Sequence, residues 1–124
     1  MSDFPRFDLH AYLVDYPTEM GLGAEDPAEV LGRYHCPEIE YVSDGIVMGH
    51  DRLVAHAGPA RRNARSIQVD VHDALVDGDR VAARYTMTTE VRKRGTLVVE
   101  VCMFGRLCSD GRVHRIDQIT RDLG

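Results

Sequence analysis

The chain has 124 residues, of which 44% are hydrophobic and 28% charged, and its formal net charge is −5. This length fits one domain over residues 1–124, and the composition is ordinary for a globular protein. The net negative charge gives no overall support for a nucleic-acid partner, and no apolar run approaches the roughly 20 residues that span a bilayer. The first residues lack the basic segment and apolar stretch of a signal peptide, so we expect a cytoplasmic protein without a membrane partner.

Cysteine and histidine spacing gives no sign of a metal site. The chain has an odd number of cysteines, which lack CxxC spacing: Cys36, Cys102 and Cys108. We therefore expect neither a disulfide framework nor a zinc site. Cys102 falls in a strand-like run, where we expect a buried thiol that packs as a small hydrophobe. The six histidines do not form HExxH or a comparable ligand spacing.

The first half of the chain reads as helical. Leu13 and Tyr16 belong to an apolar helical pattern that begins near residue 6, and Pro17 is expected to end or kink this helix. Asp26 and Pro27 are typical of a helix start, as N-cap and first helical residue. We expect Pro37 to close that second helix.

A short strand over residues 39–42 is followed by a third predicted helix, from about residue 50 to 65. Its apolar face carries Leu53, His56, Ala57 and Ala60. The Gly58-Pro59 pair weakens this helix, so a break there is compatible with the sequence.

From residue 66 the hydrophobic period changes from 3.6 to 2, which is typical of strands. We expect strands from residue 66, over 80–92, over 96–108 and over 112–121, with hairpin turns at Asp77-Gly78 and Asp110-Gly111. Helices followed by a long antiparallel meander indicate an α+β fold. A ferredoxin-like sandwich would need a helix between these strands, and none is visible.

Several turns and caps together resemble one known family. They are Asp26-Pro27-Ala28-Glu29-Val30-Leu31, Pro37-Glu38-Ile39-Glu40-Tyr41-Val42, Asp77-Gly78-Asp79-Arg80-Val81-Ala82 and Asp110-Gly111-Arg112-Val113. With them, nearly the whole chain resembles the nuclear transport factor 2-like superfamily, in particular its SnoaL-like (polyketide cyclase-like) branch. These motifs specify fold better than chemistry.

The resemblance implies a cystatin-like or nuclear transport factor 2-like cone, in which N-terminal helices pack on a curved, mainly antiparallel sheet around a small-molecule pocket. It also implies a homodimer formed through the outer sheet face. Relatives include ketosteroid isomerases, limonene epoxide hydrolases, polyketide cyclases and non-enzymatic binding domains. The enzymes among them use carboxylates and tyrosines without metal or organic cofactor, so we expect no cofactor.

Two carboxylates are candidate catalytic groups. Asp44 follows the first strand, near the place where the isomerases carry their base, and a pKa raised by an apolar cavity would suit proton abstraction. Alternatively, Asp44-Gly45 makes only a turn. Asp117 lies near the catalytic aspartate of the cyclases, but the spacing differs by one residue. Either Asp117 or Gln118 therefore points inward, and the other points to the opposite face.

Tyr16 and His56 complete the candidate catalytic set. Tyr12 and Tyr16 share the helix face on which isomerases place an oxyanion-binding tyrosine. Alternatively, and in preference for either residue alone, they are core aromatics whose hydroxyls reach solvent. His56 lies on the apolar side of its helix, as an acid or base or as a core residue.

The remaining candidate residues describe an apolar wall. Met103 and Val101 stand where the isomerases and epoxide hydrolases carry catalytic polar groups, so both catalytic patterns are broken. The expected ligand-binding residues are Tyr12, Tyr41, Ala83, Tyr85, Met87, Val101, Met103 and Gln118.

Two functions follow from this pattern, and the sequence leaves open whether the protein is an enzyme. One is a pocket protein acting by cofactor-free acid–base chemistry on an apolar, steroid- or polyketide-like metabolite. The other is a non-catalytic dimeric domain that binds a ligand or a partner protein.

Overall fold

The computed structural model describes residues 7–124, in which three helices flank a six-stranded sheet. The helices are α1 (Leu9–Leu22), α2 (Pro27–Tyr34) and α3 (His50–Asn63). The predicted start of α2 is confirmed, because the Asp26 side chain accepts a hydrogen bond from Ala28 N at 3.0 Å and Pro27 is the first helical residue.

Both internal prolines lie within helices that continue past them. Helix α1 runs through Pro17, so of the two expected outcomes, an end or a kink, the end is wrong; Leu13 and Met20 are buried on either side of the proline. Packing on both sides outweighs the one backbone hydrogen bond that proline removes. Helix α3 likewise runs through Pro59, and Asn63 Nδ2 donates to the Pro59 carbonyl at 2.9 Å.

The sheet has the strand order β2-β1-β6-β5-β4-β3. The strands are β1 (His35–Ser43), β2 (Ile46–Met48), β3 (Ala64–Asp77), β4 (Arg80–Val91), β5 (Gly95–Leu107) and β6 (Val113–Asp122). Strands β3 to β6 form the predicted antiparallel meander, whereas β1 pairs with β6 in parallel. The short strand β2 was not predicted; it returns antiparallel to β1 after the Asp44-Gly45 turn.

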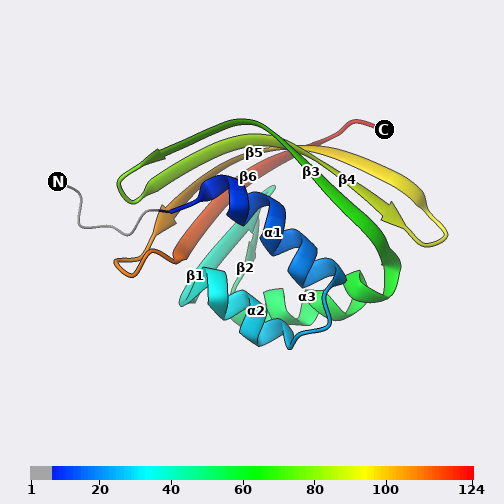
Figure 1. Cartoon of the computed structure of the whole chain (residues 1–124), viewed down its shortest axis with the longest axis horizontal. Helices are drawn as coiled ribbons and strands as arrows, with labels where there is room; N and C mark the ends of the chain where they lie inside the picture. The colour runs from blue at the N-terminus through cyan, green and yellow to red at the C-terminus, as the bar shows by residue number, and fades with distance from the viewer. Residues whose placement is uncertain (1–6) are drawn as a thin grey trace.

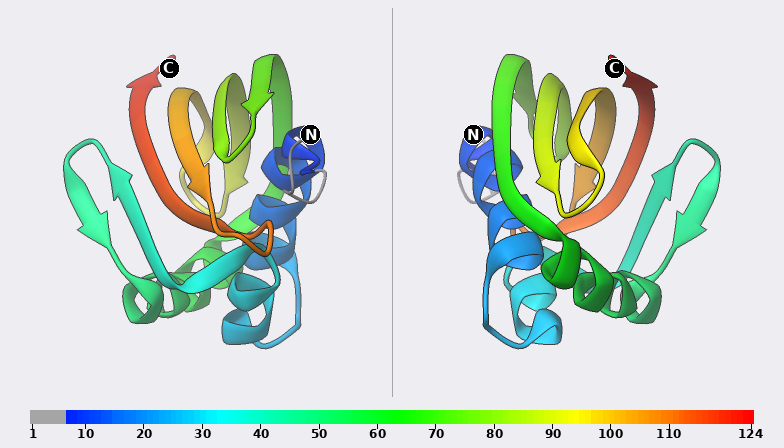
Figure 2. Two further views of the ribbon diagram at one scale, coloured as in Figure 1. Left: turned by 90° about the vertical axis from the view of Figure 1, so that its left-hand side faces the viewer. Right: turned by 90° about the vertical axis from the view of Figure 1, so that its right-hand side faces the viewer.

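The helices lie on one side of the sheet, and the long strands arch over α1 (Figure 1). Two side views show the strands spreading away from the helices, so that the sheet and helices together form a cone (Figure 2). The predicted α+β cone is therefore confirmed. Within residues 7–124, no helix has both the length and the apolar character to cross a membrane.

The two faces of the sheet differ sharply in how far their apolar side chains are exposed. On the inner side, the core includes Val30, Leu31 and Val113, which have no exposed surface. On the outer side, Phe104 is 72% exposed and Ile119 is 73% exposed. Cys102 is also exposed, so the expectation of a buried thiol is wrong: alternation along β5 turns Val101 and Met103 inward and Cys102 outward.

Candidate ligand-binding site

A cavity of about 370 Å³ lies between α1, α3 and the inner face of the sheet. One face of α1 contributes Tyr12, Leu13, Tyr16, Pro17, Met20 and Gly21. The predicted apolar face of α3 and four strands contribute Leu53, His56, Ala57, Ala60, Tyr41, Met48, Ile67, Tyr85 and Met87. Among residues 7–124, the titratable side chains on this wall are four tyrosines and one histidine, and no carboxylate lines it.

Tyr12 belongs to a buried hydrogen-bonded chain. Its hydroxyl lies 2.8 Å from His35 Nε2, and His35 Nδ1 lies 2.9 Å from the Leu31 carbonyl oxygen. A carbonyl only accepts hydrogen bonds, so Nδ1 carries the proton and the Tyr12 hydroxyl donates to Nε2. Burial lowers the pKa of His35 to about 4, against the opposing effect of the Leu31 bond. His35 is therefore neutral at pH 7, and the Tyr12 proton is already engaged.

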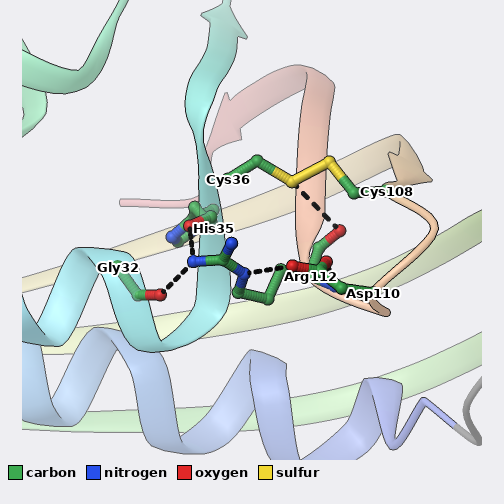
Figure 3. The surroundings of a disulfide bond; sticks show 6 residues. All are labelled: Gly32, His35, Cys36, Cys108, Asp110 and Arg112. Carbon is green, nitrogen blue, oxygen red and sulfur yellow. Dashed lines mark hydrogen bonds and ion pairs between the residues drawn. A yellow bond between two sulfur atoms is a disulfide. The ribbon is translucent and has the colours of Figure 1, made fainter.

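The residue after His35 belongs to a cross-link that was not predicted. Cys36 and Cys108 form a disulfide, which corrects the expectation that the cysteines form no disulfide framework (Figure 3). They lie 72 residues apart in sequence, so their proximity depends on how β1 and the end of β5 fold together. Beside them, the Arg112 guanidinium donates to the Gly32 carbonyl at 3.0 Å and to the Asp110 carboxylate at 2.8 Å.

That corner of the molecule also holds a group of possible metal ligands, since Cys36, Cys108 and Asp110 place donor atoms within 4.8 Å of one another. Both sulfurs are joined in the disulfide, and Asp110 is paired with Arg112. All three possible metal ligands therefore already have partners in the folded chain.

Tyr16 is the second tyrosine that α1 contributes to the cavity wall. Its ring stacks on Tyr12, with ring centroids 5.6 Å apart and planes 1° apart, and meets His35 edge-on at 4.6 Å. Its hydroxyl makes no hydrogen bond within residues 7–124, and neither does that of Tyr85. In contrast, Tyr34 beside them donates to the Glu19 carboxylate.

Tyr41 reaches the cavity from β1 and is oriented by the last strand. Its hydroxyl donates to Gln118 Oε1 at 2.9 Å, and Gln118 Nε2 donates to Ser43 Oγ at 3.0 Å. Gln118 therefore points toward the inner side and supports Tyr41 from behind, without itself lining the cavity.

The four tyrosines are strongly desolvated. Burial raises the pKa of Tyr41 to about 12. Burial also raises the pKa of Tyr12, Tyr16 and Tyr85 well above the usual tyrosine value, and the nearby Tyr41 hydroxyl adds to each shift. At neutral pH all four are hydrogen-bond donors rather than phenolates.

Asp44 does not reach this cavity. It occupies the left-handed turn between β1 and β2, at φ 50°, with an exposed side chain. Its carboxylate accepts hydrogen bonds from Thr120 N at 2.8 Å and Thr120 Oγ1 at 2.5 Å. These bonds hold the pKa of Asp44 below its usual value, which is the opposite of the shift expected for a base beside an apolar cavity.

Asp117 also lies away from the cavity, which resolves the question of strand parity. It projects from the outer face of β6, where Arg115 donates to its two carboxylate oxygens at 2.8 and 3.0 Å. This bidentate pair holds the pKa of Asp117 below its usual value. Gln118 takes the inner side because neighbouring residues of a strand face opposite ways.

Of the other candidate residues, His56, Tyr85 and Met87 line the cavity. Ala83, Val101 and Met103 are buried in the core but do not border the cavity. His35 was missed as a site residue. The sequence signal for it was weak, because it stands where α2 ends and β1 begins and follows neither element's pattern.

Comparison with known proteins agrees with this architecture. A model of the SnoaL-like domain matches residues 19–116. An NTF2-like protein of unknown function from Exiguobacterium sp. 255-15 has a TM-score of 0.73 at 16% identity, covering 91% of this chain and 97% of that one. No curated protein matches by sequence.

Two further solved structures share the fold. One is a protein with a ketosteroid isomerase-like fold from Catenulispora acidiphila DSM 44928, solved with trimethylamine; its TM-score is 0.66 at 14% identity, covering 89% of this chain and 82% of that one. The other is a SnoaL-like polyketide cyclase candidate from Jannaschia sp. CCS1, with a TM-score of 0.66 at 16% identity, covering 90% and 81%. At these identities the likeness establishes the fold alone. The family match over residues 19–116, together with the cone of helices and sheet, places this chain in the SnoaL-like domain family of the nuclear transport factor 2-like superfamily.

Proposed function

We propose that this chain binds a small, largely apolar metabolite of steroid or polyketide type in the cavity between α1, α3 and the sheet. The observation that carries the proposal is a mainly apolar wall that bears one histidine and four neutral tyrosines. The hydroxyls of two of these tyrosines, Tyr16 and Tyr85, have no partner within residues 7–124. Such hydroxyls can donate to a ligand carbonyl. The volume of about 370 Å³ lies within the usual range for small-molecule sites.

Calorimetric titration with progesterone, a neutral polycyclic ketone, tests this proposal. We expect saturable binding to the native protein and its loss in Ala60→Phe, which places a phenyl ring on the cavity wall. Ala55→Phe is the matched control, because Ala55 is exposed on the same helix and does not line the cavity. Equal binding by both variants would place the ligand elsewhere.

Catalysis by proton transfer is the second candidate function. It is favoured by the presence of His56, an exposed imidazole, on the same cavity wall as Tyr16. In this scheme His56 removes a proton next to a ligand carbonyl, and Tyr16 stabilises the developing oxyanion. Asp44 and Asp117 have no part in it, because each is engaged outside the cavity.

Deuterium exchange tests this second function. Progesterone incubated with the protein in D₂O should gain deuterium beside its ketones, and His56→Gln should slow this by about 10²-fold or more. Exchange by the native protein at the rate of buffer alone would leave binding as the function.

The dimer implied by the family has a matching surface. Leu75 and Phe104, each 72% exposed, and Ile119, at 73%, lie on strands β3, β5 and β6. We propose that the outer sheet face pairs with a second copy. Light scattering should give a dimer for the native protein and a monomer for Phe104→Glu, while Leu22→Glu, on α1, should remain dimeric. A native monomer would contradict this.

A cytoplasmic location stays a prediction. Disulfides are rare in the cytosol, so the Cys36–Cys108 bond bears directly on it. Thiols should be alkylated in living cells before lysis. Free Cys36 and Cys108 would agree with the cytosol, and protected cysteines would indicate an oxidising compartment.

A further inference from the structure

A second hollow opens beside the cavity. It has a volume of about 650 Å³ and lies between the end of α3 and the turn that joins β4 to β5. Its wall shares His56, Ala60 and Ile67 with the inner cavity, so the two spaces are neighbours across these three side chains.

The rim of this outer hollow is basic. Arg92, Lys93 and Arg94 occupy the β4–β5 turn and line the hollow, in a chain whose formal net charge is −5. Elsewhere, Arg33, Arg84, Arg112, Arg115 and Arg121 form ion pairs with carboxylates. Within residues 7–124, none of the three rim cations has a carboxylate oxygen within 4.0 Å.

The basic turn is held against the helix. The backbone N–H of Arg92 donates to the Asn63 carbonyl, at the last residue of α3, at 2.7 Å. Within the turn, the Arg94 N–H donates to the Val91 carbonyl at 3.2 Å, and Lys93 takes a left-handed conformation at φ 67°. These contacts fix the backbone of the basic turn, whose three cations line the outer hollow.

An apolar cavity beside a basic rim suits an amphiphilic ligand, which has an apolar body and an anionic head. We propose that the ligand is an amphiphilic carboxylic acid, whose apolar body fills the inner cavity and whose carboxylate lies in the outer hollow against the basic turn. This inference deepens the proposed function and rests on it. Arginine suits the role, because its guanidinium forms charge-assisted, bidentate hydrogen bonds with a carboxylate.

Calorimetry with decanoate and decan-1-ol, which share a chain and differ in the anionic head, tests the inference. The first variant, Arg92→Gln with Arg94→Gln, removes two charges from the rim. The control, Arg62→Gln with Arg65→Gln, removes two charges from exposed residues near the end of α3 that do not line either hollow. Ala60→Phe, on the wall common to both spaces, reports whether binding occurs there.

We expect native protein to bind decanoate more tightly than decanol, and more weakly at higher salt. The rim variant should lose on the order of tenfold in decanoate affinity, the effect of losing hydrogen bonds to a charged group, and should keep decanol binding unchanged. The control should bind both compounds as the native protein does, and Ala60→Phe should bind neither.

Two results would overturn the inference and leave the proposed function standing: equal native affinity for both compounds, or the same decanoate loss in the rim variant and the control. If progesterone, decanoate and decanol all fail to bind the native protein, the proposed function fails and the inference fails with it.

Discussion

The buried His35 side chain makes protein stability depend on pH in a defined window. The residue is 1% exposed, and burial lowers its pKa from 6.5 to about 4. In the unfolded chain, His35 takes up a proton as the pH falls through about 6.5, whereas the folded protein resists it until about pH 4. The unfolded state therefore binds more protons between these values, and folding stability falls as the pH is lowered through them.

The magnitude follows from the difference between the two pKa values. Each pKa unit corresponds to about 1.4 kcal/mol, so His35 alone should lower the free energy of unfolding by roughly 3 kcal/mol between pH 7 and pH 4. The slope of the free energy of unfolding against pH should approach the value for the uptake of one proton. Below pH 4 the free energy should stop falling. Urea denaturation at closely spaced pH values measures it directly.

A variant comparison isolates the contribution of His35. His35→Gln should lose this pH dependence and be less stable at pH 7, because glutamine cannot reproduce both the Tyr12 and the Leu31 hydrogen bonds with the same geometry. His10→Gln, on the exposed side of α1, should follow the native curve. If His35→Gln retains the native slope between pH 6.5 and pH 4, the assignment of a buried neutral imidazole is wrong.

Three further changes test the same structure. Tyr12→Phe leaves His35 Nε2 without its donor and should destabilise the protein by about 1–3 kcal/mol, measured by urea denaturation. Cys36→Ser opens a loop of 72 residues and should lower the free energy of unfolding by about 4 kcal/mol relative to the oxidised protein. Thermal denaturation with and without reductant measures this loss. A native protein whose stability does not respond to reductant would contradict the disulfide. Asp44→Asn should leave progesterone binding and deuterium exchange unchanged, because this carboxylate caps a turn outside the cavity; a hundredfold slower exchange would restore Asp44 as the base.

Local patterns in the sequence were sufficient for the elements that depend on neighbouring residues. The start of α2 is a local feature, because the Asp26 side chain accepts a hydrogen bond from a backbone N–H only two residues later and Pro27 is the first helical residue. The α3 face of Leu53, His56 and Ala57 follows from helical spacing, and all three line the cavity. Alternating residues and Asp-Gly turns likewise predicted the strands of the meander.

Tertiary structure decided which side chains meet. A shift of one residue moves an entire strand pattern to the opposite face, so only the pairing of β6 with β5 and β1 assigns Gln118 inward and Asp117 outward. The Cys36–Cys108 bond joins residues that no local spacing relates. For the same reason, the Tyr12–His35 hydrogen bond, which brings α1 against the end of α2, became visible only in the folded chain.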